Sequence, residues 1–223
     1  MDYFILSQAP VFKGFSPAEI ERIFSEVKYQ VKRYKSDSMI SANGEPVNSL
    51  IIVLDGIVKG EMVDYAGRVI KIEDIHAPGA IASAFMFGDR NKFPVNVISV
   101  TSTELLIIDK PEFLKLLKSD DKILVNFLDM ISNRSQFLSE KIKYLNFKTI
   151  KAKLAQYILQ KAGKEGTVVI LDKKQNELAE FFGVARPSVA RAIHEMEEEG
   201  LMVAEGKKIK IVNKKGLSDL IFD

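Results

Sequence analysis

The sequence contains no cysteine, and its two histidines, His76 and His194, lie far apart along the chain. Without cysteine the protein cannot form disulfides, bind zinc or an iron–sulfur cluster through thiolates, or use a thiol in catalysis or redox sensing. Two separated histidines are too few for a metal site built from imidazole ligands. The sequence also lacks a Gly-x-x-x-x-Gly-Lys phosphate loop and a nucleophile constellation. We therefore predict no enzymatic activity and no cofactor.

Long apolar runs are missing as well. No run approaches the ~20 residues that a membrane-spanning helix needs, and the first ten residues, Met1–Pro10, lack the basic lead of a signal peptide. We therefore expect a cytoplasmic protein without a membrane partner. A net charge of +2 gives no argument for nucleic-acid binding, so such a function must be read from the sequence pattern. The 223 residues allow two modest domains or one large one.

Short β-branched runs separated by turn signals fill the chain from about residue 29 to 109. The predicted strands are Tyr29–Tyr34, Ser49–Leu54, Ile57–Val63, Val69–Ile75, Val95–Val100 and Glu104–Ile108. The turn signals are Asn43-Gly44, Asp55-Gly56, Ala66-Gly67 and Pro78-Gly79. This pattern predicts an antiparallel β-roll of the jelly-roll type. A short amphipathic helix over residues 16–27, capped by Ser16, is expected before it. We assign residues 1–118 to this domain of an α+β protein.

A helical pattern returns after Lys110-Pro111, and its longest stretch carries a heptad seam. Apolar residues with one polar position alternate spacings of four and three at Leu124, Leu128, Ile131, Ser135, Leu138, Ile142 and Leu145. A helix that packs on its own domain usually has a broader apolar face, and here only Val125, Phe127 and Phe137 widen the seam. We therefore favour an intermolecular coiled coil over residues 119–145, which would make the protein a parallel homodimer. Packing on its own domain is the alternative.

The stretch from Gln175 to His194 has the pattern of a helix-turn-helix. Ala179 supplies the small residue where the two helices cross, and Gly183 suits a turn that needs positive φ. Pro187 is tolerated at the start of the second helix. The apolar residues with the phases needed to lock the helices together are Leu178, Phe182, Val184, Val189 and Ala192.

The second helix of this motif is expected to present Arg186, Ser188 and Arg191 to DNA. Arginine can bond bidentately to guanine in the major groove, and serine suits a phosphate or a base edge. The next segment, Gly200–Val212, predicts a β-hairpin turning at Glu205-Gly206. Its return strand would carry Lys207, Lys208 and Lys210, placed to contact phosphates. A plain helical hairpin with surface arginines is the alternative, and the basic hairpin argues against it.

We therefore predict a winged helix-turn-helix over residues 146–223, with double-stranded DNA as its partner. The acidic residues at the far end of its second helix are Glu195, Glu197, Glu198 and Glu199. We interpret them as a solvated face.

The order of β-roll, heptad helix and winged helix-turn-helix resembles the Crp/Fnr superfamily of bacterial regulators. Ser49–Gly56 looks like the strand that enters the family's conserved turn, Ser139–Lys141 lies on the long helix as in cyclic-AMP-binding members, and Gly183–Ile193 is similar to the family's turn and recognition helix. The resemblance implies an effector-sensing β-roll and a dimer that binds a palindrome through major grooves about 34 Å apart. An activator of this family would also contact RNA polymerase.

The chain departs from the cyclic-AMP-binding members at the effector site. Those members hold the ribose with a Gly-Glu pair and the phosphate with an Arg-Ser pair. Here Ala82-Ser83 and Pro94-Val95 take these places, and Arg90 is offset. Because a cyclic phosphate has no evident counter-charge, we predict a different effector. On the recognition helix, Pro187 replaces the family's frequent glutamate, so the family's usual half-site is not expected unchanged.

The predicted pocket is apolar with a few hydroxyls and amides. Its residues are Ser83, Phe85, Met86, Phe87, Phe93, Asn96, Ser99, Leu138 and Ser139. Such a pocket suits an apolar or aromatic molecule, as in family members that recognise halogenated phenols. A filled core is an equal alternative for these residues. Two other functions stay open, a regulator controlled by abundance alone and a signalling module acting through protein partners.

Overall fold

The computed structural model describes residues 1–163 and 165–222, apart from the side chain of Leu145. The place of Leu145 in the predicted seam therefore lies outside the described residues. The chain divides into two compact units, Met1–Arg134 and Ser135–Asp223. The division falls inside the long helix α4 (Asp121–Leu145), so the two halves of this helix belong to different units.

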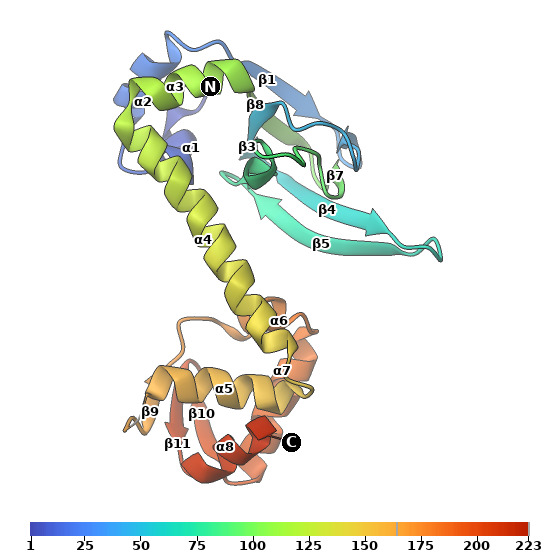
Figure 1. The fold of residues 1–223 in the computed structure, drawn as a ribbon, viewed down its shortest axis with the longest axis vertical. Helices are drawn as coiled ribbons and strands as arrows, with labels where there is room; N and C mark the ends of the chain where they lie inside the picture. Colours follow the sequence, from blue (N-terminus) through green and yellow to red (C-terminus); the bar gives the residue numbers. More distant parts are fainter. Residues whose placement is uncertain (164, 223) are drawn as a thin grey trace. The chain divides into compact units, whose positions relative to one another are not determined.

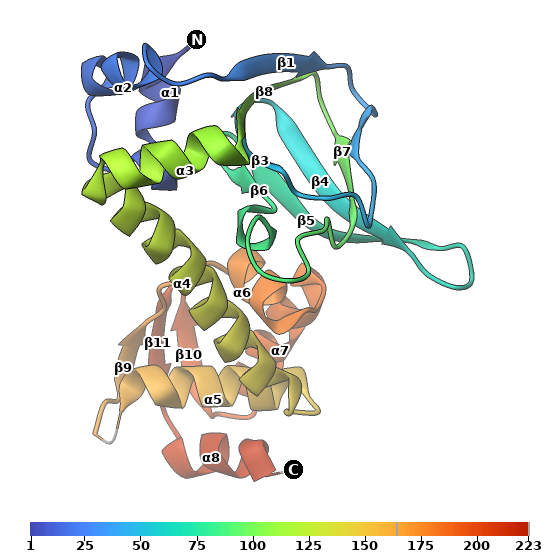
Figure 2. The same cartoon turned by 45° about the horizontal axis from the view of Figure 1, so that its top comes forward.

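Two antiparallel four-stranded sheets build the amino-terminal unit (Figures 1 and 2). The first has the order β1 (Gln30–Tyr34), β8 (Thr103–Asp109), β3 (Ser49–Asp55) and β6 (Ala80–Ile81). The second has the order β2 (Met39–Ser41), β7 (Asn96–Ser99), β4 (Ile57–Val63) and β5 (Val69–His76). All six predicted strands are present, which confirms the antiparallel roll. Strands β2 and β6 were not predicted, because runs of three and two residues carry no periodic signal.

Helices and short helical turns complete the amino-terminal unit. They are α1 (Tyr3–Ser7), α2 (Pro17–Phe24), α3 (Lys110–Ser119) and the 3-10 turns Pro10–Phe12 and Ser83–Phe85. Ser16 and Glu19 form the capping box that starts α2. The Asp120 carboxylate accepts hydrogen bonds from the backbone amides of Lys122 and Ile123, and so caps α4.

The first half of α4 is fixed to the core of the amino-terminal unit. Ile123 and Phe127 are buried there. The Phe127 ring lies edge-on to Phe87 and Phe113, with centroid distances of 5.9 and 5.0 Å. Phe127 thus joins the helix to the segment after β6 and to α3.

The carboxy-terminal unit packs helices around a small sheet. Its helices are α5 (Ile150–Ala162), α6 (Gln175–Phe182), α7 (Arg186–Glu198) and α8 (Lys214–Phe222). Its strands have the order β10 (Met202–Glu205), β11 (Lys208–Ile211) and β9 (Val168–Ile170). Tyr144, from the end of α4, is buried against the Phe181 ring of α6 at 4.9 Å. The second half of α4 is therefore part of this core. Helix α8 was not predicted.

Across residues 1–163 and 165–222, no helix combines the length and the apolar character that crossing a bilayer requires.

Replacing Phe127 with Ala should lower the free energy of unfolding of the amino-terminal unit by about 3–5 kcal/mol, because it leaves a cavity between α4, α3 and the roll. Asp129→Ala, an exposed position on the same helix, should change it by less than about 0.5 kcal/mol. Urea unfolding followed by circular dichroism measures both. Equal effects of the two substitutions would contradict the assigned anchoring role of Phe127.

Candidate DNA-binding surface and effector pocket

Helices α6 and α7 meet at a tight turn on Gly183. This glycine has φ +67° and ψ 38°, the left-handed conformation that the sequence predicted. The Val184 amide donates to the Ala179 carbonyl at 2.9 Å and closes the turn. Lys153 of α5, itself buried, donates to the carbonyl of Phe182 at 3.2 Å. The buried residues between the helices include the predicted Leu178, Ala179, Phe182, Val189 and Ala192.

The first two turns of α7 expose the side chains predicted to contact DNA. Arg186, Pro187 and Arg191 are exposed, and Ser188 is half-buried. Ser188 and Arg191 border a hollow of about 270 Å³ that the start of α5 completes with Thr149. The helix therefore offers two guanidinium groups and one hydroxyl on a surface that the rest of the unit leaves open.

The β10–β11 hairpin forms the wing, with Met202 opposite Ile211 and Glu205 opposite Lys208. Lys208 and Lys210 are exposed on β11, as predicted. Lys207 was predicted on the same strand and instead lies in the turn, because Gly206 with φ +64° and Lys207 together reverse the chain. Its ammonium donates to the carbonyl of Asp172 at 3.0 Å.

Two further lysines, missed by the sequence analysis, lie at the start of α6. Lys173, Lys174, Arg186 and Lys207 border one hollow of about 380 Å³ between the wing turn and the starts of α6 and α7. The Asp172-Lys173-Lys174 run was visible in the sequence. Nothing in it indicated that these lysines meet the wing turn, since that contact depends on the packing of the unit.

Asp172 fixes the segment that leads into this hollow. Its carboxylate accepts hydrogen bonds from the Tyr157 hydroxyl and, at 3.0 Å, from the Lys161 ammonium. Partial burial works to raise the pKa of Asp172, but these hydrogen bonds and the charges of Lys173 and Lys161 hold it well below its usual range. Burial and the hydrogen bond to Asp172 raise the pKa of Tyr157. Asp172 therefore stays charged and Tyr157 neutral at neutral pH.

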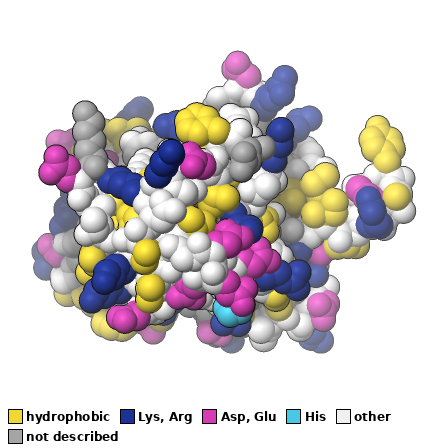
Figure 3. Space-filling view, turned by 90° about the horizontal axis from the view of Figure 1, so that it is seen from below, with side chains coloured by type: hydrophobic (Ala, Val, Ile, Leu, Met, Phe, Trp, Pro, Cys, Tyr) yellow, Lys and Arg dark blue, Asp and Glu magenta, His cyan; other side chains and the backbone are white. Residues whose placement is uncertain are grey.

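The acidic residues at the end of α7 are exposed or half-buried, so this face is partly solvated as interpreted, and three of the residues also make structural contacts. The Lys151 ammonium of α5 pairs with Glu199 at 2.7 Å and with Glu195 at 3.2 Å. Glu197 accepts a hydrogen bond from the Ala204 amide of the wing at 2.7 Å. These contacts tie the end of the helix to α5 and to the wing. On the face drawn in Figure 3, acidic side chains form a group beside a histidine, and basic side chains are scattered.

The predicted seam along α4 is largely open. Leu128, Leu138 and Ile142 are 52%, 44% and 62% exposed, and Ser135 is exposed. Leu124 and Ile131 are half-buried against the core of the amino-terminal unit. If the seam packed only within its own chain, its leucines and isoleucines would be buried. The α4 residues that are buried in the core of the amino-terminal unit are instead Ile123 and Phe127.

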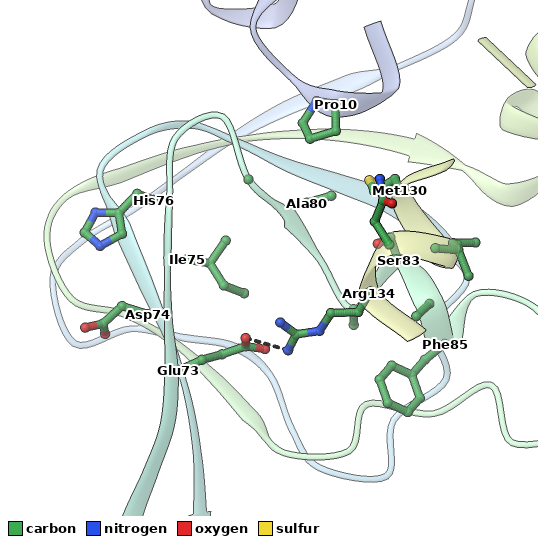
Figure 4. Close-up of a pocket in the computed structure, with 15 residues that line it drawn as sticks. Pro10, Glu73, Asp74, Ile75, His76, Ala80, Ser83, Phe85, Met130 and Arg134 are labelled. Atoms are coloured by element: carbon green, nitrogen blue, oxygen red, sulfur yellow. Dashed lines mark hydrogen bonds and ion pairs between the residues drawn. The ribbon is translucent and has the colours of Figure 1, made fainter. Parts of the chain in front are cut away.

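A pocket of about 530 Å³ opens in the amino-terminal unit between β5, the segment after β6 and α4 (Figure 4). Ser83 and Phe85 line it, as predicted. Met86 and Phe93 are buried in the core instead, and Phe87 packs on Phe127.

The polar members of the predicted set are divided. Asn96 accepts a hydrogen bond from the Asn43 amide, and Ser99 is buried and bonds to the backbone around Lys35 and Ser38. Leu138 and Ser139 belong to the carboxy-terminal unit. The structure therefore gathers only Ser83 and Phe85 of this set around the pocket. Met86, Phe93 and Ser99 are buried elsewhere in the unit, and the others lie outside the pocket.

The sequence analysis missed the charged residues of the pocket. Arg134 of α4 reaches into its middle and pairs with Glu73 of β5, with Nη2 and Oε2 2.7 Å apart (Figure 4). Asp74 and His76, also on β5, lie on the far side of the pocket. Since Arg134 stands beside the heptad seam and Glu73 on a strand 61 residues earlier, no local signal connected them.

Two family models match the chain. A cyclic nucleotide-binding domain covers residues 31–120, and a Crp-like helix-turn-helix domain covers residues 152–220. The chain belongs to the Crp/Fnr family of transcription regulators. Within that family it is a DNA-binding transcription regulator with an effector-binding domain, in the order that the sequence predicted.

Individual relatives are distant. The cyclic AMP receptor protein of Thermus thermophilus is 23% identical over 194 residues, 87% of this chain and 88% of that protein. A transcriptional regulator from Thermotoga maritima has a solved structure with 30% identity and a TM-score of 0.52, covering 58% of this chain and 98% of its own. The structure of CprK complexed with OCPA has 13% identity and a TM-score of 0.59. The match covers 91% of this chain and 93% of that chain. At that identity the likeness establishes the fold alone.

Replacing Gly183 with Ala should lower the free energy of unfolding of the carboxy-terminal unit by about 1–2 kcal/mol, because a Cβ disfavours the left-handed conformation. No atom lies within 4 Å of the added Cβ, so backbone strain alone is tested. Gly183→Asn should lose less, since asparagine adopts this conformation more readily. Denaturant unfolding measures both variants. An alanine variant as stable as the parent protein would refute the strain argument.

Proposed function

We propose that the protein is a homodimeric, sequence-specific transcription factor that binds a palindromic DNA site and responds to a small-molecule effector other than cyclic AMP. The observation that carries the DNA-binding part is the start of α7, with Arg186 and Arg191 exposed and Ser188 half-buried beside a basic wing.

Different residues have different roles in this proposal. Arg191 and Arg186 read guanines through their guanidinium forks, and Ser188 bonds to a phosphate or a base edge. Pro187 adds no hydrogen bond, so it shapes the contact only through its ring. The wing residues Lys207, Lys208 and Lys210 bind phosphates, and the basic hollow with Lys173 and Lys174 supports a further backbone contact there.

The exposed seam of α4 supports the homodimer. Leucine and isoleucine side chains that are about half exposed at heptad spacing are stabilised when a second copy covers them. Two copies related by a twofold axis present two α7 helices, and a twofold protein matches a palindromic site.

The residues of the roll support an effector other than cyclic AMP. Ala82-Ser83 and Pro94-Val95 provide neither the ribose carboxylate nor the phosphate-binding pair of cyclic-AMP-binding members. The pocket of about 530 Å³ has the size typical of small-molecule sites. The Thermus thermophilus relative is named for cyclic AMP, whereas CprK was solved with OCPA. Relatives with this fold therefore differ in the ligand named with them.

The tests of DNA reading begin with selection of bound DNA from a random pool, which should return a palindrome. On that site, Arg191→Ala should weaken binding by about 1–3 kcal/mol. Arg191→Lys keeps the charge, loses the fork, and should also bind weakly. Lys208→Ala should lower affinity for every sequence and reduce the salt slope by about 0.9. Lys215→Ala, an exposed lysine of α8, is the charge control. Fluorescence anisotropy measures all four, and unchanged affinity of Arg191→Ala would remove it from base reading.

The homodimer is tested on the seam. Leu138→Glu places a charge where two copies should meet, and it should raise the dimer dissociation constant at least about tenfold, because burying an unpaired carboxylate is costly. Gln136→Glu adds the same charge to an exposed position of α4 outside the seam and should leave the dimer intact. Sedimentation equilibrium distinguishes the variants. A monomeric parent protein, or equal behaviour of both variants, would contradict the coiled coil.

A further inference from the structure

The middle of the effector pocket holds an ion pair between side chains of two different elements. Arg134 extends from α4 and Glu73 from β5, which with β4 forms a hairpin that extends from the roll (Figure 1). The side chains are 47% and 32% exposed. The pair therefore ties the hairpin to the long helix across the pocket.

The backbone of β5 is irregular at this point. Gly60 pairs with Glu73 and Glu61 pairs with Lys71, so the register skips Ile72. An extra residue in one strand redirects the neighbouring side chains, and such bulges are common beside functional sites. The bulge here immediately precedes Glu73, the residue that contacts Arg134.

Apart from this pair, the pocket wall is mostly apolar. The other polar lining residues are Asp74, His76, Ser83 and Asn133, and the apolar ones are Pro10, Ile75, Ala80, Ala82, Ala84, Phe85, Met130 and Ile131. A molecule that fills the pocket must bury apolar surface against this wall and, at the centre, meet either the guanidinium or the carboxylate.

We propose that the effector is a small carboxylic acid with an apolar or aromatic body, and that its carboxylate takes the place of Glu73 on Arg134. This inference rests on the proposed function, because it assumes that the pocket is the effector site. Guanidinium is the group best suited to a carboxylate, since its planar fork can donate two parallel hydrogen bonds. The exchange replaces one carboxylate with another, so Arg134 keeps an anionic partner throughout.

A cationic ligand fits the pocket less well. A cation would pair with Glu73 and so remove the anionic partner of Arg134. No carboxylate lies within one turn of Arg134 on α4 to replace it, since the residues there are Met130, Ile131, Phe137 and Leu138. Asp74, the next acid on β5, already pairs with Lys71. The displaced Glu73, by contrast, stands on a hairpin whose strand β5 is largely exposed, where water can solvate it.

The exchange has a consequence for regulation. It removes the tie between the β4–β5 hairpin and α4 while the ligand body packs on Ile131, which belongs both to the pocket wall and to the heptad seam. Helix α4 continues from Arg134 into the carboxy-terminal unit. A ligand at Arg134 therefore acts directly on the helix that would carry both the dimer contact and the DNA-binding unit.

Isothermal titration calorimetry with three probes of one body tests the proposal: phenylacetate, phenylacetamide and phenethylamine. The parent protein should bind the carboxylate at least about tenfold more tightly than the amide, because the ionic hydrogen bond is lost. Glu73→Gln removes the competitor and should bind phenylacetate about threefold more tightly. Arg134→Met should lose the preference for the acid. Asp129→Asn, an exposed acid of α4 outside the pocket, is the matched control and should behave like the parent protein.

Several results would overturn the proposal. These are equal binding of acid and amide, tightest binding of the amine, no binding of any probe at 10 mM, or weaker acid binding by Glu73→Gln. If Arg134→Met does not fold, the Glu73→Gln result decides. The titrations contain no DNA, so their failure is separable from a failure of the DNA-binding proposal. Affinity for the DNA site gives a second readout. Glu73→Gln without ligand should shift this affinity in the same direction as phenylacetate shifts it for the parent protein. Opposite shifts would refute the regulatory role of the Glu73–Arg134 pair.

Discussion

Helix α4 buries aromatic side chains in two separate cores, and the rest of the structure depends on this double packing. Phe127 is held between the rings of Phe87 and Phe113 in the amino-terminal unit, and Tyr144 packs on Phe181 in the carboxy-terminal unit. Between them the backbone is a continuous helix. Each unit therefore includes one half of the same helix in its own core.

This arrangement separates the tasks of neighbouring residues on one helix. Ile123 and Phe127 are buried in the core of their own unit, whereas Leu128, Leu138 and Ile142 at heptad positions are exposed. Arg134 stands where the units divide and points into the pocket. One helix thus carries core residues, an exposed seam and a charged group at the candidate effector site. Such an arrangement is expected of a sensor that is connected to a DNA-binding unit.

Charged contacts add to the apolar core of the DNA-binding unit. Lys153 is buried against the end of α6, and Lys151 joins α5 to the acidic end of α7. The Asp172 carboxylate, just before α6, accepts hydrogen bonds from Tyr157 and Lys161. These contacts hold the ends of both helices of the motif, including α7, which carries Arg186 and Arg191.

The sequence by itself determined the elements and their order. Short β-branched runs between turn signals located six strands, the heptad spacing located α4, and Ala179 and Gly183 located the helix-turn-helix, because each of these signals lies within one element or one turn. Only the tertiary structure decided what depends on packing between distant segments. The Glu73–Arg134 pair, the basic hollow that Lys173 shares with Lys207, and the burial of Met86 and Phe93 arise where the chain folds back on itself. The physical reason is that backbone periodicity is a local property, whereas the environment of a side chain is set by whichever residues the fold brings against it.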